Sequence, residues 1–140
     1  MRVLAGKYKG RVLKTVPNIS VRPATSKVKA AIFNILQSRV DWRNAVVLDL
    51  YAGSGSVGIE ALSRGAERAV FVEFDRSALQ FLKKNIESIS LLSEAQVVFA
   101  DVKKFLTTSS RAYDVVFCDP PYAVEYLAEL PSMVFESGAV

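Results

Sequence analysis

Histidine is absent from the 140-residue sequence, and cysteine occurs once, as Cys118. A single cysteine excludes a disulfide within the chain, and the lack of histidine excludes the usual zinc sites and the Ser-His and Cys-His nucleophile systems. We therefore expect no bound metal. Chemistry carried out by this chain has to use carboxylates, backbone groups or an organic cofactor.

Long apolar runs are lacking as well. Residues 1–6 contain no apolar stretch of signal-peptide length, and no later segment is long enough to cross a bilayer. We expect a cytoplasmic protein with no membrane partner. With 51% apolar residues, a chain of this length can bury the core of one ordinary domain without a metal or disulfide, and we expect a monomer.

Acidic residues are scarce in the first third of the chain. Residues 1–44 contain ten lysines and arginines but a single acid, Asp41, which gives a balance of +9, whereas residues 45–140 have a balance of −5. A basic segment joined to an acidic body is typical of proteins whose basic part faces a polyanion. We therefore divide the chain into an RNA-facing extension, 1–44, and a ligand-binding or catalytic domain, 45–140. The alternative is a charged face that only keeps the protein in solution.

Two short alternating runs, residues 2–5 and 11–16, flank the sequence GKYKG and predict a basic β-hairpin. The candidate RNA-binding residues are Lys7, Tyr8, Lys9 and Arg11 in this region, and Arg22 after it. Tyr8 has two interpretations, because a tyrosine among lysines can stack on a base or pack against the domain.

Apolar residues at helical spacing follow Ser26, which suits a helix N-cap. The apolar positions are Val28, Ile32, Ile35, Leu36 and Val40, and the basic positions between them are Lys27, Lys29 and Arg39. The pattern predicts an amphipathic helix with a buried apolar face and a basic outer side.

After residue 44 the pattern changes to short apolar runs separated by helical stretches. The runs that predict strands are 46–50, 69–73, 96–100 and 113–118, and the stretches that predict helices are about 57–64, 76–89 and 102–108. Such runs are typical of strands buried on both faces of a parallel sheet. We predict an α/β fold with a doubly wound sheet, in which ligands bind beyond the carboxyl ends of the strands.

The first predicted strand leads into a glycine-rich loop. Gly53, Gly55 and Gly58 fit the dinucleotide pattern G-x-G-x-x-G, and Glu73 ends the next strand, where an acid can bind ribose hydroxyls. A nicotinamide-dependent oxidoreductase is therefore one interpretation. A nicotinamide dinucleotide carries a pyrophosphate, however, and Asp49, four residues before Gly53, would repel a phosphate.

S-adenosylmethionine suits these acids better, because it has an ammonium group and a ribose diol and no phosphate. Asp49 suits the ammonium, and Glu73 suits the ribose. Asp101, which follows the third strand, has two interpretations, since it can accept from the adenine amino group or cap the following helix. The candidate cofactor-binding residues are Asp49, Gly53, Ser54, Gly55, Glu73 and Asp101.

The sequence Asp119-Pro120-Pro121-Tyr122 ends the fourth strand in a stiff loop, because proline cannot donate to a sheet ladder. An exocyclic amine of a nucleobase is a poor nucleophile, since its lone pair is delocalised into the ring. The Asp119 carboxylate and the Pro120 carbonyl can each accept one N–H of such an amine and so turn its lone pair toward a methyl donor. Tyr122 can stack on the base. Strand alternation predicts that Cys118 points away from this side and is buried.

These motifs carry a resemblance to a known family. The segments DLYAGSG (49–55) and DPPY (119–122) resemble those of class I methyltransferases that act on exocyclic amines. The full set resembles the RsmD-type 16S ribosomal RNA guanine-N2 methyltransferases of bacteria, through GKYKGR (6–11), RPAT (22–25), GIEALSRG (58–65) and FVE (71–73). The resemblance covers nearly the whole chain. It implies methyl transfer from S-adenosylmethionine to one guanine of 16S rRNA in the small ribosomal subunit.

The resemblance also implies roles for single residues. It gives Asp49, Gly53 and Gly55 to the methionine part of the donor, Glu73 to its ribose, Asp101 to its adenine, and Asp119, Pro120 and Tyr122 to the target amine and base. It places residues 22–25 beside the donor site.

The sequence departs from the family in two places. Family members usually have Thr-Thr-Asp-Arg after Arg-Pro, where this sequence has Ala24-Thr25-Ser26-Lys27. They also continue for three more strands, whereas this sequence stops about where a fifth would begin. We therefore expect a Rossmann-like sheet without its last strands.

Two alternative functions stay open. A DNA adenine-N6 methyltransferase would share the chemistry of the Asp-Pro-Pro-Tyr motif. A non-catalytic RNA-binding protein or ribosome assembly factor would share the basic N-terminal segment.

Overall fold

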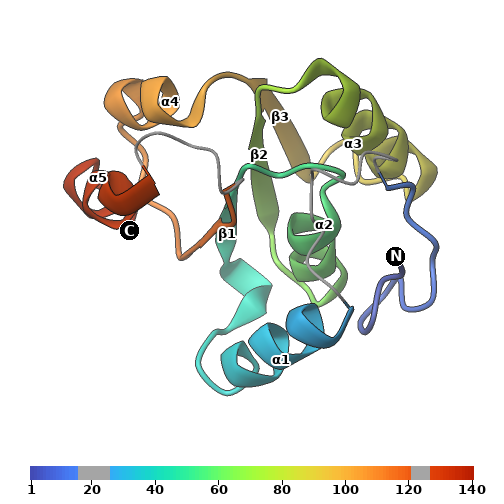
Figure 1. Ribbon diagram of the computed structural model, residues 1–140. Coiled ribbons are helices and arrows are strands. Elements are labelled where there is room, and N and C mark those ends of the chain that lie inside the picture. The colour runs from blue at the N-terminus through green and yellow to red at the C-terminus, as the bar shows by residue number, and fades with distance from the viewer. Residues whose placement is uncertain (16–25, 121–126) are drawn as a thin grey trace.

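A four-stranded parallel sheet forms the centre of the protein, in the order β3-β2-β1-β4 (Figure 1). The computed structural model describes residues 1–15, 26–120 and 127–140. The strands are β1 (Val46–Leu50), β2 (Arg68–Glu73), β3 (Ala95–Phe99) and β4 (Val115–Cys118). The α-helices are α1 (Ser26–Leu36), α2 (Ser56–Ser63), α3 (Arg76–Ser88), α4 (Val102–Thr108) and α5 (Leu130–Glu136), with short 3₁₀ turns at Trp42–Asn44 and Leu127–Glu129.

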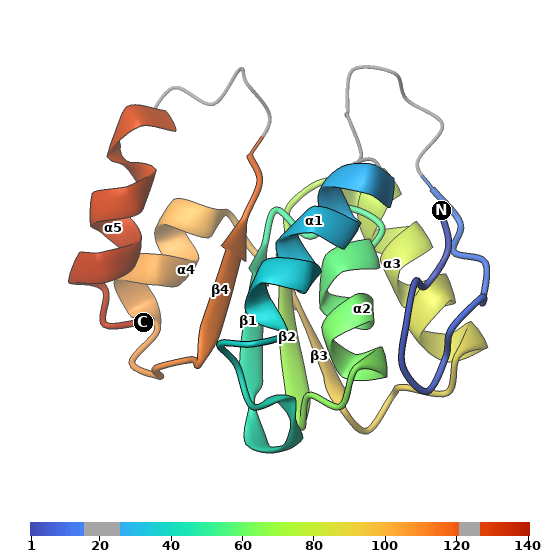
Figure 2. The same cartoon turned by 90° about the horizontal axis from the view of Figure 1, so that it is seen from below.

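Helices cover both faces of the sheet (Figure 2). Alternate residues of β1 enter two separate cores, since Val47 packs with residues of α1, α2 and α3, whereas Leu48 and Leu50 pack with residues of α4 and α5. This alternation explains why the strands read as continuous apolar runs. The predicted α/β doubly wound fold is confirmed, and each predicted strand and helix after residue 44 is present with a shift of at most two residues at its ends.

The chain changes direction across the sheet between β1 and β4. From β1 the chain adds β2 and β3 on one side, and β4 then returns to the other side of β1, where Leu50 pairs with Cys118. In doubly wound folds ligands bind at such a switch point, beyond the carboxyl ends of the strands. The start of the loop after β1 and the residue that follows β4, Asp119, lie at this place.

Residues 1–15, called the arm below, form the predicted hairpin with a single antiparallel bridge, Arg2 to Val12. The N–H of Val3 donates to the carbonyl of Arg11 at 3.0 Å, and the N–H of Leu13 donates to the carbonyl of Met1 at 2.8 Å. Val3 and Leu13 are buried in the same core as α1, α2 and α3. The arm is therefore packed onto the body of the protein.

The prediction for the helix after Ser26 is wrong for one basic and three apolar positions, whereas Leu36 and Val40 pack against the core as expected. Lys29, expected on a basic outer side, is fully buried, whereas Val28, Ile32 and Ile35, expected in the core, are 48%, 36% and 59% exposed. The cause is a buried acid on α2, Glu60, whose Oε1 lies 3.3 Å from the Lys29 ammonium. The helix turns this lysine inward, toward that charge.

Among the described residues, no helix is long and apolar enough to cross a membrane.

Candidate functional site

Asp49 lies near the carboxyl end of β1 and is 4% exposed. One of its oxygens, Oδ2, accepts from the N–H of Gly58 at 3.0 Å. Burial, together with the negative charges of Glu73 and Asp119, raises the pKa of Asp49 to about 8, and the Gly58 hydrogen bond opposes this shift in part. At neutral pH the folded protein therefore favours the protonated form of this side chain.

Glu73 ends β2 and accepts from three backbone N–H groups. Its Oε1 accepts from Gly53 at 2.7 Å, and its Oε2 accepts from Phe74 and Asp75 at 2.9 Å each. A carboxylate has about four acceptor positions, so that three of them are taken. Glu73 fixes the shape of the loop after β1 and keeps one acceptor position on Oε1 for a ligand hydroxyl.

The loop after β1, residues 51–55 and called the glycine loop below, has a left-handed backbone at three positions. Tyr51, Gly53 and Gly55 have φ values of 57°, 59° and 86°. A side chain at Gly55 would place its Cβ 2.3 Å from Leu82, whereas one at Gly53 would meet nothing within 4 Å. Gly55 is thus required by packing, and Gly53 faces open space, where a ligand can approach its backbone.

Gly58, the third glycine of the predicted pattern, is also explained by packing. A Cβ there would lie 2.3 Å from the ring of Phe71. Two glycines of the G-x-G-x-x-G pattern, Gly55 and Gly58, therefore reflect the close packing of α2 and α3 on β2, and a dinucleotide is not needed to account for them.

Asp119 follows β4 and is exposed. In the sheet register, Asp49 lies beside Phe117 and Leu50 beside Cys118, which places Asp119 next to the start of the glycine loop. Its charge raises the pKa of Asp49, as does that of Glu73. Within residues 1–15, 26–120 and 127–140, none of these three acids forms an ion pair with lysine or arginine. The switch point is therefore negatively charged and suited to a cation.

Pro120 is half-buried beside Asp119, and Tyr122 lies outside the described residues. The expectation of a buried Cys118 is wrong, because this residue is exposed at the end of β4. Desolvation by the protein atoms around its sulfur, together with the charges of Asp119 and Asp49, raises the pKa of Cys118 to about 11. A thiol with a raised pKa is a poor nucleophile.

Asp101 caps α4, since its Oδ2 accepts from the N–H of Lys104 at 3.2 Å. Two exposed aromatic rings that the sequence reasoning missed lie at the ends of the neighbouring strands. Phe74 and Phe99 stack with their centroids 5.3 Å apart, and the Arg76 guanidinium lies 5.4 Å from the Phe99 ring. Their position directly after β2 and at the end of β3 was the available signal. They offer an apolar surface beside Glu73 and Asp101.

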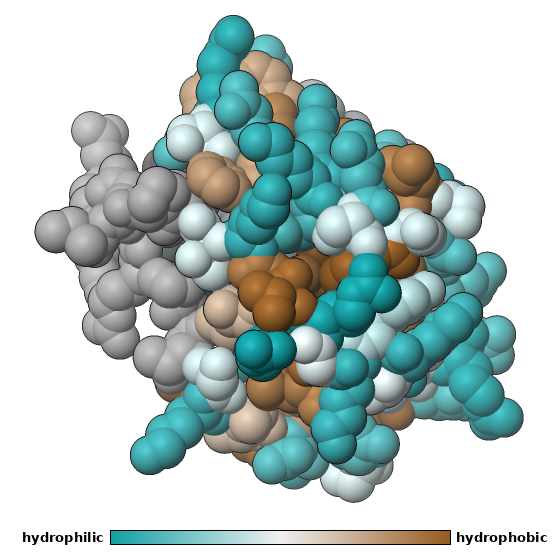
Figure 3. All heavy atoms as spheres, turned by 90° about the vertical axis from the view of Figure 1, so that its right-hand side faces the viewer, coloured by the Kyte–Doolittle hydropathy of each residue, from teal (hydrophilic) through white to brown (hydrophobic). Residues whose placement is uncertain are grey.

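The predicted RNA-binding residues of the arm divide into two kinds. Lys7 and Lys9 are exposed. The side of the molecule that carries the arm is mostly hydrophilic, with a hydrophobic patch near its centre (Figure 3). Tyr8 is partly buried against the main core with the Lys7 ammonium 5.6 Å from its ring, and the Arg11 guanidinium donates to the carbonyl of Ser88 at the end of α3. Arg22 lies outside the described residues.

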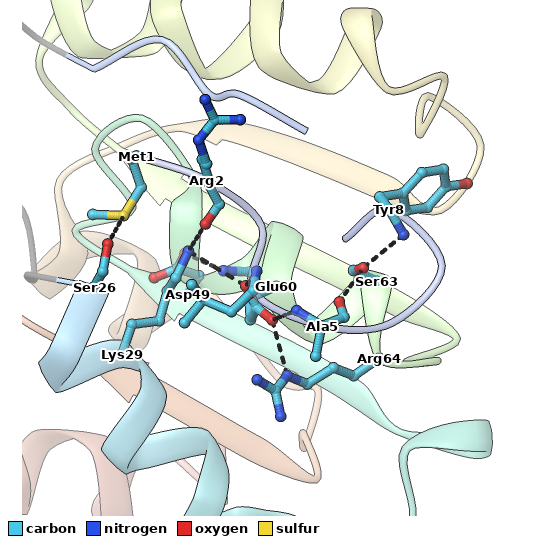
Figure 4. Close-up of polar contacts among 12 residues, drawn as sticks. Met1, Arg2, Ala5, Tyr8, Ser26, Lys29, Asp49, Glu60, Ser63 and Arg64 are labelled. Carbon is cyan, nitrogen blue, oxygen red and sulfur yellow. Dashed lines mark hydrogen bonds and ion pairs between the residues drawn. The ribbon is translucent and has the colours of Figure 1, made fainter. Parts of the chain in front are cut away.

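Glu60 is a second buried acid that the sequence reasoning missed (Figure 4). Its Oε1 accepts from the N–H of Leu4 at 2.8 Å, and its Oε2 accepts from the N–H of Ala5 at 3.1 Å and from Arg64 at 2.9 Å. Lys29 completes the group and also donates to the carbonyl of Arg2 at 2.9 Å. An acid within the otherwise apolar α2 was the available signal. This network holds the arm and α1 on α2.

Across the part of the chain that the structure describes, no group of three or more histidines, cysteines, aspartates or glutamates could hold a metal ion. The residues at the switch point supply carboxylates, backbone groups and aromatic rings.

Known proteins match the chain over nearly its whole length. The family model described as Conserved hypothetical protein 95 matches residues 1–140. The "Putative rRNA methyltransferase YlbH" of Bacillus subtilis is 42% identical, with 97% of this chain and 74% of that protein aligned. The "Ribosomal RNA small subunit methyltransferase D" of Escherichia coli K12 is 34% identical, with 99% of this chain and 68% of that protein aligned.

Solved structures agree with this match. The "Putative methyltransferase yhhF from Escherichia coli" superposes with a TM-score of 0.85 at 35% identity, covering 99% of this chain and 73% of that one. A precorrin-6Y methyltransferase domain from Rhodobacter capsulatus has a TM-score of 0.68 at 20% identity, which shows the shared fold alone. The resemblance found in the sequence is confirmed, and the chain belongs to the family described as Conserved hypothetical protein 95, the RsmD-type methyltransferases.

Proposed function

We propose that this protein transfers a methyl group from S-adenosylmethionine to the exocyclic N2 amine of a guanine in 16S rRNA. The names of the relatives support a methyltransferase that acts on small-subunit rRNA. The observation that carries the proposal is the negatively charged switch point, where the charges of Glu73 and Asp119 act on the buried Asp49 and none of the three acids has a basic partner among the described residues.

The acids at the switch point fit this donor. Asp49 is a buried carboxyl group with a raised pKa, and an ammonium group beside it would offset both its desolvation and the repulsion from the other two acids. A dinucleotide pyrophosphate would add negative charge at the same place, which disfavours the oxidoreductase interpretation. S-adenosylmethionine supplies an electrophilic methyl group when it is bound.

Other residues around Asp49 can hold the rest of the donor. Glu73 keeps an acceptor position for a ribose hydroxyl, and the open side of Gly53 lets the methionine part approach the backbone of the glycine loop. The exposed rings of Phe74 and Phe99 offer a stacking surface for adenine. Asp101 can accept from the adenine amino group with the carboxylate that also caps α4.

The target amine would be placed by the loop after β4. The Asp119 carboxylate and the Pro120 carbonyl accept one N–H each, so that the nitrogen lone pair points toward the donor. Catalysis then consists of orientation and electrostatic stabilisation, without a strong base. We assign stacking on the base to Tyr122, and contact with the RNA backbone to Lys7, Lys9 and the other basic residues of the arm.

Methyl transfer from labelled S-adenosylmethionine to small ribosomal subunits, free 16S rRNA and DNA tests the proposal, followed by mapping of the modified base. We expect label at the N2 amine of a guanine in 16S rRNA. Label on adenine N6 of DNA would replace this function with the DNA-modifying alternative. Binding of 16S rRNA without binding of S-adenosylhomocysteine would favour a non-catalytic RNA-binding protein.

A further inference from the structure

Asn85 on α3 joins two segments that lie far apart in the sequence. Its side chain is 1% exposed, and its Oδ1 accepts from the N–H of Lys14 in the arm at 2.8 Å. Its Nδ2 donates to the carbonyl of Lys14 and to the carbonyl of Ser54 in the glycine loop, each at 2.9 Å. One amide therefore holds the arm and the glycine loop together.

The three partners allow one orientation of this amide. The N–H of Lys14 needs an acceptor, and the carbonyls of Lys14 and Ser54 need donors. With the amide reversed, the side-chain oxygen would point at both carbonyls, and an oxygen cannot donate to them. Neither aspartate nor leucine can make these three bonds. Both side-chain donors of Asn85 are used within the protein, so its arrangement is that of a structural clamp between the two segments.

The glycine loop has anchors on two sides. Glu73 holds the N–H of Gly53 at 2.7 Å, and Asn85 holds the carbonyl of the next residue, Ser54. A loop that presents its backbone to a ligand has to keep its shape to within a fraction of an ångström for full affinity. Glu73 belongs to the proposed donor site, whereas Asn85 acts from behind it.

We infer that Asn85 is a positioning residue that holds the glycine loop of the donor site against the arm, so that donor affinity depends on this clamp. The inference rests on the proposed function, because it concerns the loop assigned to the donor. It adds that the arm, assigned to RNA, and the loop, assigned to the donor, share one buried side chain.

Ser63 provides a matched control. It is 3% exposed on α2, its Oγ accepts from the N–H of Tyr8 at 2.9 Å, and it donates to the carbonyl of Ala5 at 2.7 Å. Like Asn85, it binds the arm through two backbone groups. Unlike Asn85, it has no hydrogen bond to the glycine loop among the described residues. A difference between the two positions therefore reports on the loop and not on the arm.

The experiment is a calorimetric titration of S-adenosylhomocysteine into the 140-residue protein and its Asn85→Ala, Asn85→Asp and Ser63→Ala variants, below the onset of thermal unfolding. We expect Asn85→Ala and Asn85→Asp to bind about tenfold more weakly, because the Ser54 carbonyl loses its donor and the loop loses its shape. We expect the affinity of Ser63→Ala to stay within about twofold of the wild-type affinity, because this variant leaves the hydrogen bonds of the glycine loop in place. Asn85→Asp keeps the size of the side chain and is the informative variant where Asn85→Ala is poorly folded.

Steady-state kinetics give a second readout that loss of stability alone would not move. The KM for the donor should rise about tenfold in the Asn85 variants with kcat within about twofold, since the amide touches no reacting atom. Equal donor affinity in folded Asn85 and Ser63 variants would overturn the inference and leave the proposed function intact. Failure of the wild-type protein to bind S-adenosylhomocysteine would overturn both.

Discussion

Asp49 and Glu60 are both buried acids, and their surroundings are opposite. Glu60 is fully buried, forms ion pairs with Lys29 and Arg64, and accepts from the N–H groups of Leu4 and Ala5. Asp49 is nearly as buried, yet it receives a single N–H from Gly58 and lies near two further negative charges. A buried acid with a full set of donors is part of the architecture, whereas a buried acid without a cation is suited to a charged ligand.

Asp119 should show the largest effect on methyl transfer, because it is assigned to the reacting amine. We expect Asp119→Ala to lower the transfer rate by about 10²-fold to 10⁴-fold while donor affinity stays nearly unchanged, the range typical of a positioned proton-accepting group. Rate and donor affinity are measured on the same preparation. Tyr122→Phe is the matched comparison and should keep most of the transfer rate, since stacking needs the ring and not the hydroxyl. Equal transfer by a folded Asp119→Ala protein would remove Asp119 from the mechanism.

Glu60 should show the largest effect on stability. Glu60→Gln leaves Lys29 buried without its counter-charge, and burial already lowers the pKa of Lys29 against the opposing effect of Glu60. Breaking a buried ion pair costs about 3 to 5 kcal/mol. Urea unfolding measures this loss in free energy. A loss below about 1 kcal/mol would show that the network contributes little and would weaken the contrast with Asp49.

Asp49→Asn should have the opposite effects to Glu60→Gln, weakening donor binding without lowering stability. We expect it to weaken donor binding by about 1 to 3 kcal/mol, because the ammonium loses its carboxylate partner. The free energy of unfolding should stay equal or rise, since a buried acid that has no cation among the described residues is removed. Titration with S-adenosylhomocysteine and urea unfolding of the same variant test both halves. A variant that loses stability and keeps donor affinity would make Asp49 structural.

The pH dependence of stability also distinguishes Asp49 from Glu60. The pKa of Asp49 is raised to about 8 in the folded protein, whereas an unfolded aspartate titrates near pH 4. Between these values the unfolded state has lost the proton that the folded state keeps, so the Asp49 contribution to stability falls as pH rises from about 4 to about 8. Asp49→Asn should remove this fall. The test is urea unfolding of both proteins at pH 5 and pH 8, and an identical pH dependence would contradict the raised pKa.

The smallest effects should come from the arm. Glutamine at Lys7 and Lys9 removes two exposed charges without touching the contacts of Glu60 or Asn85. Each lost phosphate contact should flatten the slope of log affinity against log salt by about 1. Filter binding of 16S rRNA over a range of salt concentrations measures the slope. An unchanged slope would mean that these lysines serve solubility alone.

The sheet and its edge were predictable from the sequence because they depend on local patterns. Continuous apolar runs marked β1 to β4, and the acids Asp49, Glu73 and Asp119 stood at the ends of their strands. Parallel strands bring such ends together, so the gathering of these acids followed from the topology. Asp75 and Asp101 cap α3 and α4 through backbone N–H groups, as short polar side chains at such positions do.

Features that depend on a distant partner were not predictable. Lys29 is buried because Glu60 lies opposite, 31 residues further along the chain, and hydropathy alone placed this lysine in solvent. Nothing in the local pattern singled out Asn85, because its role depends on contacts with the arm and the glycine loop. Cys118 is exposed at the end of β4, where alternation along the strand alone suggested burial.

The contrast between the two buried acids is tested most directly by calorimetry of S-adenosylhomocysteine binding at pH 6.5, in two buffers of different ionisation enthalpy. Asp49 is protonated at this pH because its pKa is about 8, and an ammonium group binds its ionised form. The wild-type protein should therefore release about one proton for each ligand bound, and Asp49→Asn should bind more weakly and release none. Binding of equal strength by both proteins, with the same proton release, would contradict the assignment of Asp49 to the donor.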